Sequence, residues 1–386
     1  MVKDWKYKKI GDIAEIRMCK RIFAGQTKTS GDIPFFKIGT FGKKPDAFIS
    51  QTLYDEYKGK YSFPNKGDIL LSAAGTLGRT VVYDGKPAYF QDSNIVWLEI
   101  DKSQICNEYL SHYYQAILWA SSEGSTISRL YNGIIRNTEI TIPPLTEQKS
   151  IATILSDTDI LIATLEKLIA KKYAIKQGAM QELLTGKRRL LGFSGEWVEV
   201  KLRNTGEIIT GSTPPTSVNE YWNGNILWVT PTDITDKKDI INVERKISET
   251  GLSVIRTLPS NTLLVTCIAS IGKNTILRTR GASNQQINAI IPYDEYDVDF
   301  LYYLVENNKI LLEGKAGITA TKIISKKEFA EIIFRLPVTK NEQIAIAAIL
   351  SDMDTEIEAL SIKLSKLKQI KQGMMQELLT GRIRLR

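Results

Sequence analysis

The feature that most constrains this chain is a long segment that occurs twice. Residues 147–190 (EQKSIATILSDTDILIATLEKLIAKKYAIKQGAMQELLTGKRRL) return as residues 342–385 (EQIAIAAILSDMDTEIEALSIKLSKLKQIKQGMMQELLTGRIRL). About 25 positions are identical, without a gap and at an offset of about half the chain, which indicates a duplicated domain rather than a solenoid repeat. A doubled module has a pseudo-two-fold axis available, so it can present two similar surfaces to one partner.

Both copies have the pattern of a long helix with one apolar seam. Thr146 and Asn341 are helix-start signals, and Gly186 and Gly381 stand where the helices should end. Apolar residues recur at alternating spacings of three and four, as in a coiled coil. We expect the two helices to pack antiparallel through these seams; the alternative is that each seam packs only on its own domain. The seam residues are Leu155, Ile162, Leu165, Ile169, Leu350, Met353, Ile357, Leu360, Leu364 and Leu367.

The segments between the helices have a different character. They are rich in short apolar runs, glycine and turn signals, and runs such as Ile69–Ser72 and Asn94–Ile100 are typical of strands. Helical stretches are expected near residues 109–119 and 300–312. The predicted fold class is therefore α+β: two pseudo-symmetric α/β globules, residues 1–145 and 191–339, are separated by two long antiparallel helices. These helices, residues 146–190 and 340–386, form a coiled-coil-like spacer.

Weaker similarities relate the two globules to each other. The matching positions indicate that the two globules share a scaffold, whereas the residues between these positions differ. This favours two globules with related but distinct specificities. The matched positions include Trp5 with Trp197, Leu77-Gly78-Arg79 with Ile271-Gly272-Lys273, Gln91 with Gln285, and Asn94 with Asn288.

Composition narrows the class of partner. A net charge of +8 and a pI of about 9.1 favour a polyanion, usually nucleic acid. Three scattered cysteines without CxxC spacing argue against a disulfide framework or a zinc site and favour a reducing cytoplasm. The first residues lack the apolar core of a signal peptide, and there is no run of about 18 apolar residues, so we expect no membrane partner.

Signatures of catalysis are missing from the sequence. Gly272-Lys273-Asn274 lacks the glycine spacing and the hydroxyl of a phosphate-binding loop. Pro143-Pro144 has neither the preceding Asp or Asn nor the following aromatic residue of an adenine methyltransferase motif. We therefore expect no catalytic residue, no metal and no cofactor in this chain. A nuclease centre built from scattered acidic residues stays an open alternative.

The order of these parts resembles a known family. A globule followed by a helix ending in KQGxMQELLTG, both repeated, together with Gly211-Ser-Thr-Pro-Pro215 and Tyr221-Trp-Asn-Gly, is similar to the specificity subunit of type I restriction–modification systems. The first globule departs from this pattern at Ala24-Gly25-Gln26. The resemblance implies that each globule is a target recognition domain reading one half of a bipartite, asymmetric site in double-stranded DNA. It implies that the helix pair sets the spacer between the halves and docks the methyltransferase subunits.

The same resemblance implies the other components of a complex. Two adenine-N6 methyltransferase (modification) subunits and two translocase–nuclease (restriction) subunits would complete it. S-adenosylmethionine, ATP and magnesium would then be bound by those partners. Two rival functions remain open: a self-contained DNA methyltransferase or nuclease with fused recognition domains, and a structural coiled-coil adaptor that does not contact DNA.

Candidate DNA-binding residues follow from the chemistry of base and phosphate contacts. Arg and Lys suit guanine, Asn and Gln suit adenine, and cations and hydroxyls suit phosphate. For each residue singly, an ordinary surface or packing role is the alternative. The candidates in the first globule are Arg17, Lys20, Arg21, Lys37, Arg79, Gln91, Asn94, Arg129 and Asn132, and those in the second are Thr213, Thr230, Lys273, Asn274, Arg278, Asn284, Gln285, Gln286 and Lys322.

Overall fold

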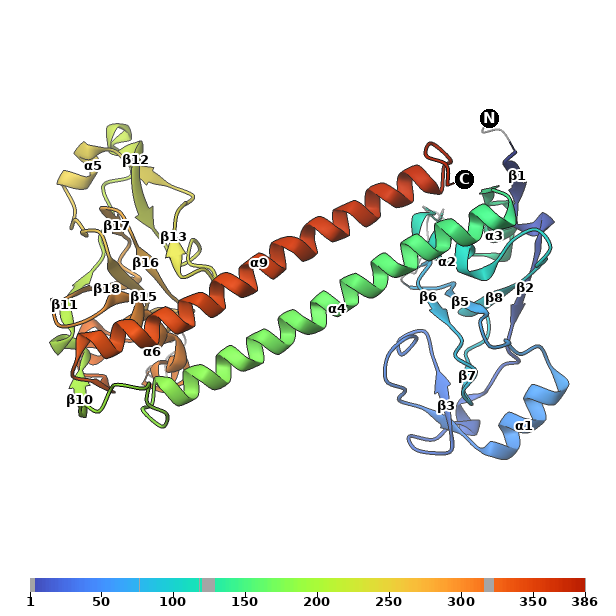
Figure 1. The fold of residues 1–386 in the computed structure, drawn as a ribbon, viewed down its shortest axis with the longest axis horizontal. Helices are drawn as coiled ribbons and strands as arrows, with labels where there is room; N and C mark the ends of the chain where they lie inside the picture. The colour runs from blue at the N-terminus through green and yellow to red at the C-terminus, as the bar shows by residue number, and fades with distance from the viewer. Residues whose placement is uncertain (1–3, 76, 118, 120–128, 316–322, 386) are drawn as a thin grey trace. The chain divides into compact units, whose positions relative to one another are not determined.

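The protein divides into two compact units in a computed structural model that describes residues 4–75, 77–117, 119, 129–315 and 323–385. Unit 1 comprises Met1–Glu166 with Ile362–Arg386, and unit 2 comprises Lys167–Ser361. Each unit therefore contains one globule and a part of each long helix (Figure 1).

Unit 1 is built on a four-stranded sheet of order β2-β8-β5-β6, which is joined by a three-stranded sheet β4-β3-β7 and a pair β1-β9. The expected strands at Ile69–Ser72 and within Asn94–Ile100 are confirmed as β5 and β8. The strands are β1 Lys6–Lys9, β2 Ala14–Met18, β3 Ile33–Phe36, β4 Phe48–Ile49, β5 Ile69–Ser72, β6 Thr80–Val82, β7 Tyr89–Phe90, β8 Ile95–Ile100 and β9 Glu139–Ile142. The short helices are α1 Gln51–Lys60, α2 Asn107–Ala116 and α3 Asn132–Asn137.

Unit 2 repeats this topology with one additional strand. Its sheets have the orders β11-β18-β15-β16-β13, β14-β12-β17 and β10-β19, so β13 has no counterpart among the described strands of unit 1. The strands are β10 Trp197–Lys201, β11 Gly206–Thr210, β12 Trp222–Val229, β13 Asp239–Ile240, β14 Lys246–Ile247, β15 Thr262–Thr266, β16 Asn274–Leu277, β17 Gly281–Ser283, β18 Ile287–Pro292 and β19 Ile333–Pro337. The short helices are α5 Glu249–Ser253, α6 Val298–Asn307, α7 Lys309–Lys315 and α8 Lys326–Ala330.

Both faces of each central sheet are buried. Along β5, Ile69 and Leu71 belong to the cluster beneath the helices, whereas Leu70 belongs to the cluster shared with β3 and β7. In unit 2, Leu263 and Leu264 of β15 divide between two clusters in the same way. Successive side chains of a strand point to opposite faces, so a strand buried on both faces is a continuous apolar run. This is why the sequence alone revealed these strands.

Equivalent hydrogen bonds confirm the match of Leu77-Gly78-Arg79 with Ile271-Gly272-Lys273. The Gly78 amide donates to the Ser72 carbonyl at 3.1 Å, and the Gly272 amide donates to the Thr266 carbonyl at 2.9 Å. The glycines have φ of +77° and +82°, a left-handed conformation that glycine adopts without strain.

The predicted match of Gln91 and Asn94 with Gln285 and Asn288 is wrong. The Gln91 amide donates to the carbonyl that ends β3, and the Asn284 amide donates to the carbonyl that ends β12. The carbonyls of Asn94 and Gln286 likewise accept from equivalent amides after β5 and β15. Gln91 is therefore equivalent to Asn284, and Asn94 to Gln286. The shift arises because the loop after β17 is one residue shorter than the loop after β7.

The two long helices, α4 Leu145–Leu183 and α9 Lys340–Leu378, each contain 39 residues. α4 begins one residue before its expected bound and α9 begins at its expected bound, so the predicted start signals Thr146 and Asn341 lie inside the helices; in α4 the Pro144 carbonyl already accepts from the Gln148 amide. Each is followed by a glycine in the left-handed conformation, at Gly186 and Gly381, as predicted. None of the described helices is long and apolar enough to cross a membrane.

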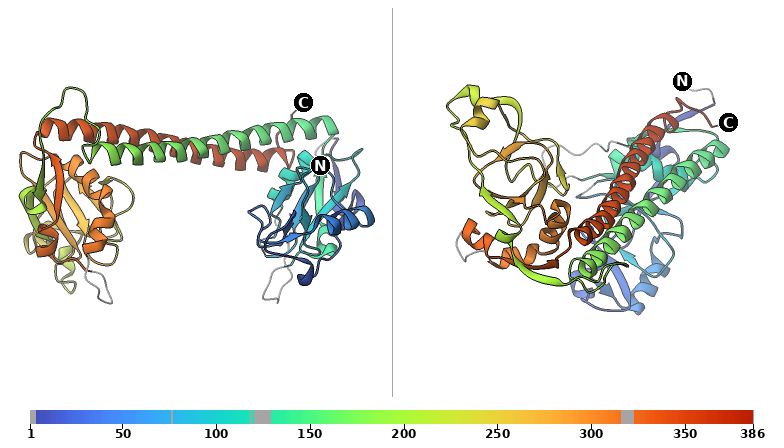
Figure 2. Two further views of the ribbon diagram at one scale, coloured as in Figure 1. Left: turned by 90° about the horizontal axis from the view of Figure 1, so that it is seen from below. Right: turned by 60° about the vertical axis from the view of Figure 1, so that its left-hand side comes forward.

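Ion pairs join the two helices within each unit. In unit 1, Asp159 and Glu166 of α4 pair with Lys371 and Lys368 of α9, each at 2.7 Å. In unit 2, Lys172 pairs with Glu356 at 2.6 Å, and Lys176 pairs with Asp354. Residue numbers rise along α4 as they fall along α9, so the two segments run antiparallel in each unit (Figure 2).

All the predicted seam residues are buried or half-buried. The buried ones are Leu155, Leu165, Leu350 and Ile357, and the half-buried ones are Ile162, Ile169, Met353, Leu360, Leu364 and Leu367. The core of unit 1 contains Leu155 of α4 together with Leu378 of α9, and the core of unit 2 contains Leu350 of α9 with Leu183 of α4. Each globule is therefore packed against both long helices.

Candidate nucleic-acid interface

Several predicted residues of unit 2 meet at one edge, where the parallel strands β12 and β17 both end. Thr230 follows β12, and Asn284, Gln285 and Gln286 follow β17. The Thr213 hydroxyl donates to Gln285 Oε1 at 2.7 Å, and Asn284 Nδ2 donates to Gln286 Oε1 at 3.1 Å. We call this polar group the unit 2 loop edge; it consists of the half-buried Thr213, Thr230 and Asn284 and the exposed Gln285 and Gln286.

Hydrogen bonds to β12 and β17 fix the loop that contains Thr213. The Ser212 amide donates to the Ser283 carbonyl at 2.7 Å, and the Ser212 carbonyl accepts from Trp228 Nε1 at 3.0 Å. A Cβ added to Gly211 would lie 2.2 Å from the Asn284 carbonyl oxygen, so only glycine fits at this close approach. The loop edge is therefore a rigid surface with amide and hydroxyl groups at its rim.

Thr230 makes hydrogen bonds within the loop that follows β12. Its amide and hydroxyl both donate to Asp233 Oδ2, at 2.8 and 2.7 Å, while Asp233 Oδ1 accepts from the Glu244 amide at 2.8 Å. The Thr230 hydroxyl also lies 2.8 Å from that of Thr232. These bonds tie the loop after β12 to the segment that precedes β14.

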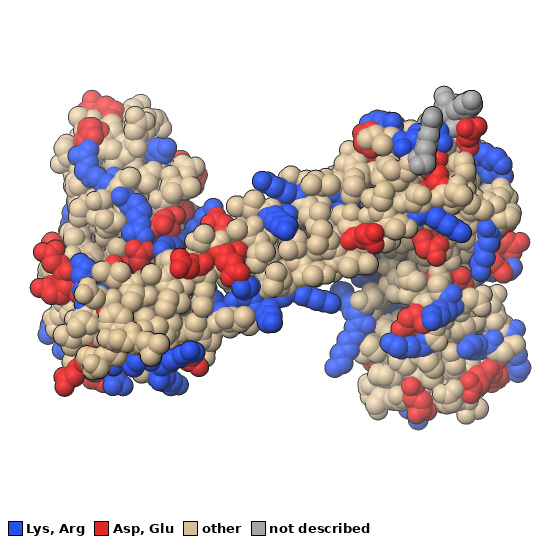
Figure 3. Space-filling model, viewed as in Figure 1, with Lys and Arg blue, Asp and Glu red and all other residues tan. Residues whose placement is uncertain are grey.

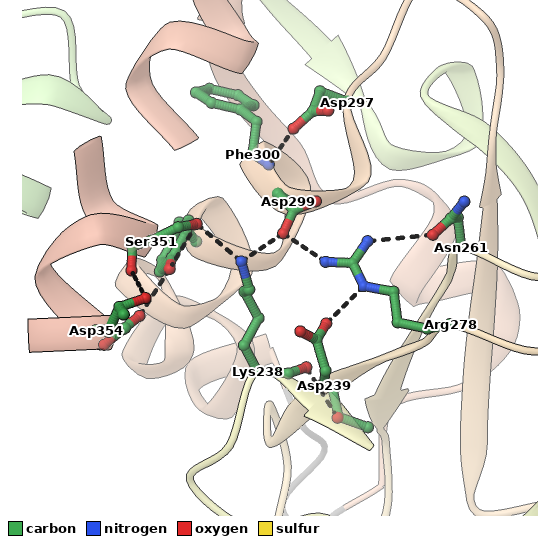
Figure 4. A network of polar contacts seen from close by, with 12 residues as sticks. Lys238, Asp239, Asn261, Arg278, Asp297, Asp299, Phe300, Ser351 and Asp354 are labelled. Atoms are coloured by element: carbon green, nitrogen blue, oxygen red, sulfur yellow. Dashed lines mark hydrogen bonds and ion pairs between the residues drawn. The ribbon is translucent and has the colours of Figure 1, made fainter. Parts of the chain in front are cut away.

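The other predicted residues of unit 2 lie in different surroundings. Lys273 is exposed, whereas Asn274 is buried and donates from Nδ2 to the Tyr302 carbonyl at 3.4 Å. Arg278 directly follows β16, the strand that Asn274 begins. Its guanidinium contacts Asp239 at 2.7 Å and Asp299 at 2.6 Å (Figure 4). These bonds favour structural roles for Asn274 and Arg278. Lys322 lies outside the described residues.

Arg278 belongs to a network that joins the globule to α9. Lys238 pairs with Asp299 at 2.6 Å and donates to Ser351 of α9 at 2.8 Å (Figure 4). Burial raises the pKa of Asp299, but the hydrogen bonds from Arg278 and Lys238 outweigh burial and leave that pKa below its ordinary value. The carboxylate stays ionised and holds the loop before β13 against the long helix.

Unit 1 has an equivalent loop edge where the parallel strands β3 and β7 end. Lys37 follows β3 and Gln91 follows β7. Gln91 Oε1 accepts from the Ile38 amide at 3.0 Å, and Arg79 Nη2 donates to the Ile38 carbonyl at 2.9 Å. The structure therefore gathers Lys37, Arg79 and Gln91, with the half-buried Asn94 in the same loop as Gln91.

The remaining candidates of unit 1 are less closely grouped. Arg21 pairs with Asp92, next to Gln91, at 2.8 Å, and Lys20 lies 5.2 Å from the ring centroid of Tyr61. Arg129 and Asn132 are exposed. Arg17 is separate, because it pairs with Glu15 and Glu99, each at 2.7 Å, and lines a hollow with Asp68.

Charge alone does not locate an interface. On the face in Figure 3, Lys and Arg are interspersed with Asp and Glu over each globule and do not form one continuous basic band. Among the described residues, no group of three or more His, Cys, Asp or Glu side chains could hold a metal ion. The observed surfaces suit recognition by hydrogen bonds at two similar loop edges.

Two features were missed by the sequence analysis. The Arg245 guanidinium lies 3.7 Å from the ring centroid of Trp222, beside the unit 2 loop edge. In addition, buried Glu147 and Glu342 bind arginines that follow the other long helix, namely Arg384 and Arg189. The second feature had a signal, because Glu-Gln and the terminal Arg-Leu recur in both copies of the repeat.

Comparison with known proteins gives consistent matches. The family model described as the type I restriction modification DNA specificity domain matches residues 2–172 and 194–370. The putative type I restriction enzyme MjaX specificity subunit of Methanocaldococcus jannaschii is 26% identical over 428 residues, covering 100% of this chain and 95% of that protein. The putative specificity subunit S.HindORF215P of Haemophilus influenzae is 57% identical over 152 residues, covering 39% of this chain and 40% of that protein.

A solved structure shares the fold. The crystal structure of a type I restriction–modification system S subunit from M. genitalium superposes with a TM-score of 0.64 at 16% sequence identity. The superposition covers 97% of this chain and 96% of that one.

Proposed function

The chain belongs to the type I restriction modification DNA specificity family, and we propose that each of its globules binds one half of a bipartite, asymmetric site in double-stranded DNA. The observation that carries this proposal is the repeated loop edge. Unit 1 places Lys37 after β3 and Gln91 after β7, with Arg79 bound to the loop after β3; unit 2 places Thr230 after β12 and residues 284–286 after β17, with Thr213 bound to Gln285. Equivalent positions with different side chains suit two half-sites of different sequence.

The long helices are proposed to set the spacer between the two half-sites. Each helix of 39 residues is about 58 Å long, which exceeds the roughly 34 Å of one turn of B-DNA. Both helices enter the core of each globule, so a rigid pair would fix the distance between the loop edges. The same helices would dock the modification subunits.

The chain is a recognition subunit and not by itself an enzyme. We propose that it acts in the cytoplasm with two methyltransferase subunits and two translocase–nuclease subunits. S-adenosylmethionine would bind to the methyltransferase subunits, and ATP and Mg²⁺ to the translocase–nuclease subunits. The family match and the full-length similarity to named specificity subunits support this arrangement.

A reconstitution experiment tests the function against both rivals. The purified chain with S-adenosylmethionine and duplex DNA should transfer no methyl group, and adding the modification subunit of the same genome should start transfer to adenine. Methyl transfer by the chain alone would establish the self-contained enzyme instead. The complex should also bind duplex DNA with a log affinity that falls by about 0.9 per neutralised phosphate per log unit of salt. Complete absence of DNA binding would support the structural adaptor.

A further inference from the structure

Arg245 lies on a fixed aromatic platform in unit 2. Its guanidinium carbon is 3.7 Å from the ring centroid of Trp222 and 5.5 Å from that of Trp228. The two indole rings meet edge to face, with their centroids 5.1 Å apart and an interplanar angle of 88°. Both rings are buried, whereas Arg245 is exposed.

Hydrogen bonds fix the platform to the unit 2 loop edge. Trp222 Nε1 donates to the Pro215 carbonyl at 3.2 Å, and Trp228 Nε1 donates to the Ser212 carbonyl at 3.0 Å. Both bonds end on the loop that contains Thr213. The indoles therefore have no free N–H group, and what they offer to Arg245 is their ring faces and edges.

The strand register places Arg245 beside the loop edge. Lys246 pairs with Leu227 across β14 and β12, so Arg245 lies across from Trp228, near the end of β12 that leads to Thr230. Its neighbour Glu244 donates its amide to Asp233, the residue that binds Thr230. Arg245 is thus attached from two sides to the polar group that the proposed function assigns to DNA.

The guanidinium has unused hydrogen-bonding capacity. No carboxylate among the described residues lies within ion-pair distance of Arg245, whereas Arg278 and Arg280 of the same unit both have such partners. Stacking over a ring occupies one face of the guanidinium and leaves its in-plane N–H groups to point away from the indole. A fork of parallel N–H donors held in one plane matches the O6 and N7 acceptors of guanine.

We propose that Arg245 reads a guanine in the half-site bound by unit 2. This inference rests on the proposed function and adds a specificity-determining residue to it. The planar fork also matches phosphate, but Arg245 lies beside the amide side chains of the loop edge, whose donors and acceptors suit base edges. Unit 1 has no equivalent, because the position that corresponds to Arg245 is the buried Ala47, whose carbonyl accepts from the Phe35 amide. The guanine contact therefore belongs to one half-site only.

The test uses the complex of the full chain with its modification subunit. Duplexes that carry every single base substitution across both half-sites are titrated with the wild type, Arg245→Ala and Arg245→Lys. The wild type should discriminate against replacement of one G·C pair by about 5- to 150-fold. Arg245→Ala should lose that discrimination at this pair alone, and Arg245→Lys should reduce it at the same pair, because lysine keeps a donor for guanine but not the planar fork. The other positions should keep their discrimination.

Controls separate the possible results. Arg203→Ala removes an exposed arginine of unit 2 that pairs with Glu331 at 2.5 Å, and it should leave all discrimination unchanged. Equal weakening of binding to every duplex by Arg245→Ala, with recovery in Arg245→Lys, would mean a phosphate contact and overturn the proposal. Unchanged discrimination in both variants would also overturn it. If the wild-type complex itself recognises no bipartite site, the proposed function fails instead.

Discussion

Replacing Glu342 by alanine is expected to lower the free energy of unfolding of unit 2 by about 3–5 kcal/mol, the usual cost of breaking a buried ion pair from one side. The Glu342 side chain is 1% exposed and accepts from Arg189 Nε at 2.7 Å and Nη2 at 2.8 Å. It also accepts from Trp197 Nε1 at 3.3 Å. The variant would leave a half-buried guanidinium and an indole N–H without their acceptor.

The same contacts recur in unit 1, so Glu147→Ala should have a similar effect there. Glu147 accepts from Arg384 Nε at 2.7 Å and Nη2 at 2.8 Å, and from Trp5 Nε1 at 3.1 Å. In each unit, the tail that follows one long helix is therefore bound to the start of the other. These clamps give a structural reason for the recurrence of the Glu-Gln start and the Arg-Leu end in both copies of the repeat.

Thermal unfolding of the variants provides the measurement. Glu182→Ala is the matched control, because Glu182 is exposed and pairs with Arg188 at 3.6 Å in the same tail region. The control should change stability by no more than about 0.5 kcal/mol. Equal, small effects of Glu342→Ala and Glu182→Ala would contradict a structural role for the clamp.

The clamp also predicts a dependence on pH. Burial raises the pKa of Glu147, but the hydrogen bonds from Arg384 and Trp5 outweigh burial and lower it below the ordinary value. A carboxylate with a lowered pKa in the folded state contributes stability above its unfolded pKa of about 4.5 and loses it as the pH falls through the folded pKa. The difference in stability between wild type and Glu147→Ala should therefore shrink in acid.

Removing one heptad from each long helix should shorten the spacer of the recognised DNA site by about three base pairs. Deleting residues 164–170 and 359–365 removes about 10 Å from each helix and keeps the seam in register, because the apolar pattern repeats every seven residues. That length corresponds to about three base pairs of B-DNA. Both half-sites should stay unchanged, because neither loop edge is altered.

The methylated motif in a host genome reports this result. Inserting a heptad at the same points is the matched control and should lengthen the spacer by the same amount. Deleting two residues from each helix instead should abolish methylation, because at 3.6 residues per turn it rotates the apolar seam by about 200°, away from its partner. An unchanged spacer after the heptad deletion, or a change in either half-site, would rule out the helices as the ruler.

Much of the fold could be predicted because burial leaves a periodic trace in the sequence. Apolar residues at spacings of three and four, which include Leu155 in one helix and Leu350 in the other, predicted the long helices. Continuous apolar runs predicted strands such as Ile69–Ser72. The lengths of the loops are not marked by any periodic pattern in the sequence. The single-residue difference after β7 and β17 therefore shifted the match of Gln91 and Asn94.

The candidate site was harder to predict because the charge of a residue does not show which side chains it contacts in the folded protein. Arg278 is basic like any DNA-binding arginine, but the fold places it against Asp239 and Asp299, which are distant in sequence. Arg245 stands next to a two-residue strand that carries almost no sequence signal, and only the register of β14 with β12 places it near the tryptophans. Contacts of this kind depend on the tertiary structure. A list of basic residues read from the sequence therefore cannot separate arginines that pair with carboxylates of the fold from arginines that do not.

The central claim is that each globule reads its own half-site. The most direct measurement is the methylated motif produced after residues 196–338 are exchanged for the equivalent globule of a family member with a different recognition sequence. One half of the motif should be replaced, while the other half and the spacer length are retained. A motif in which both halves change, or in which neither changes, would contradict the account.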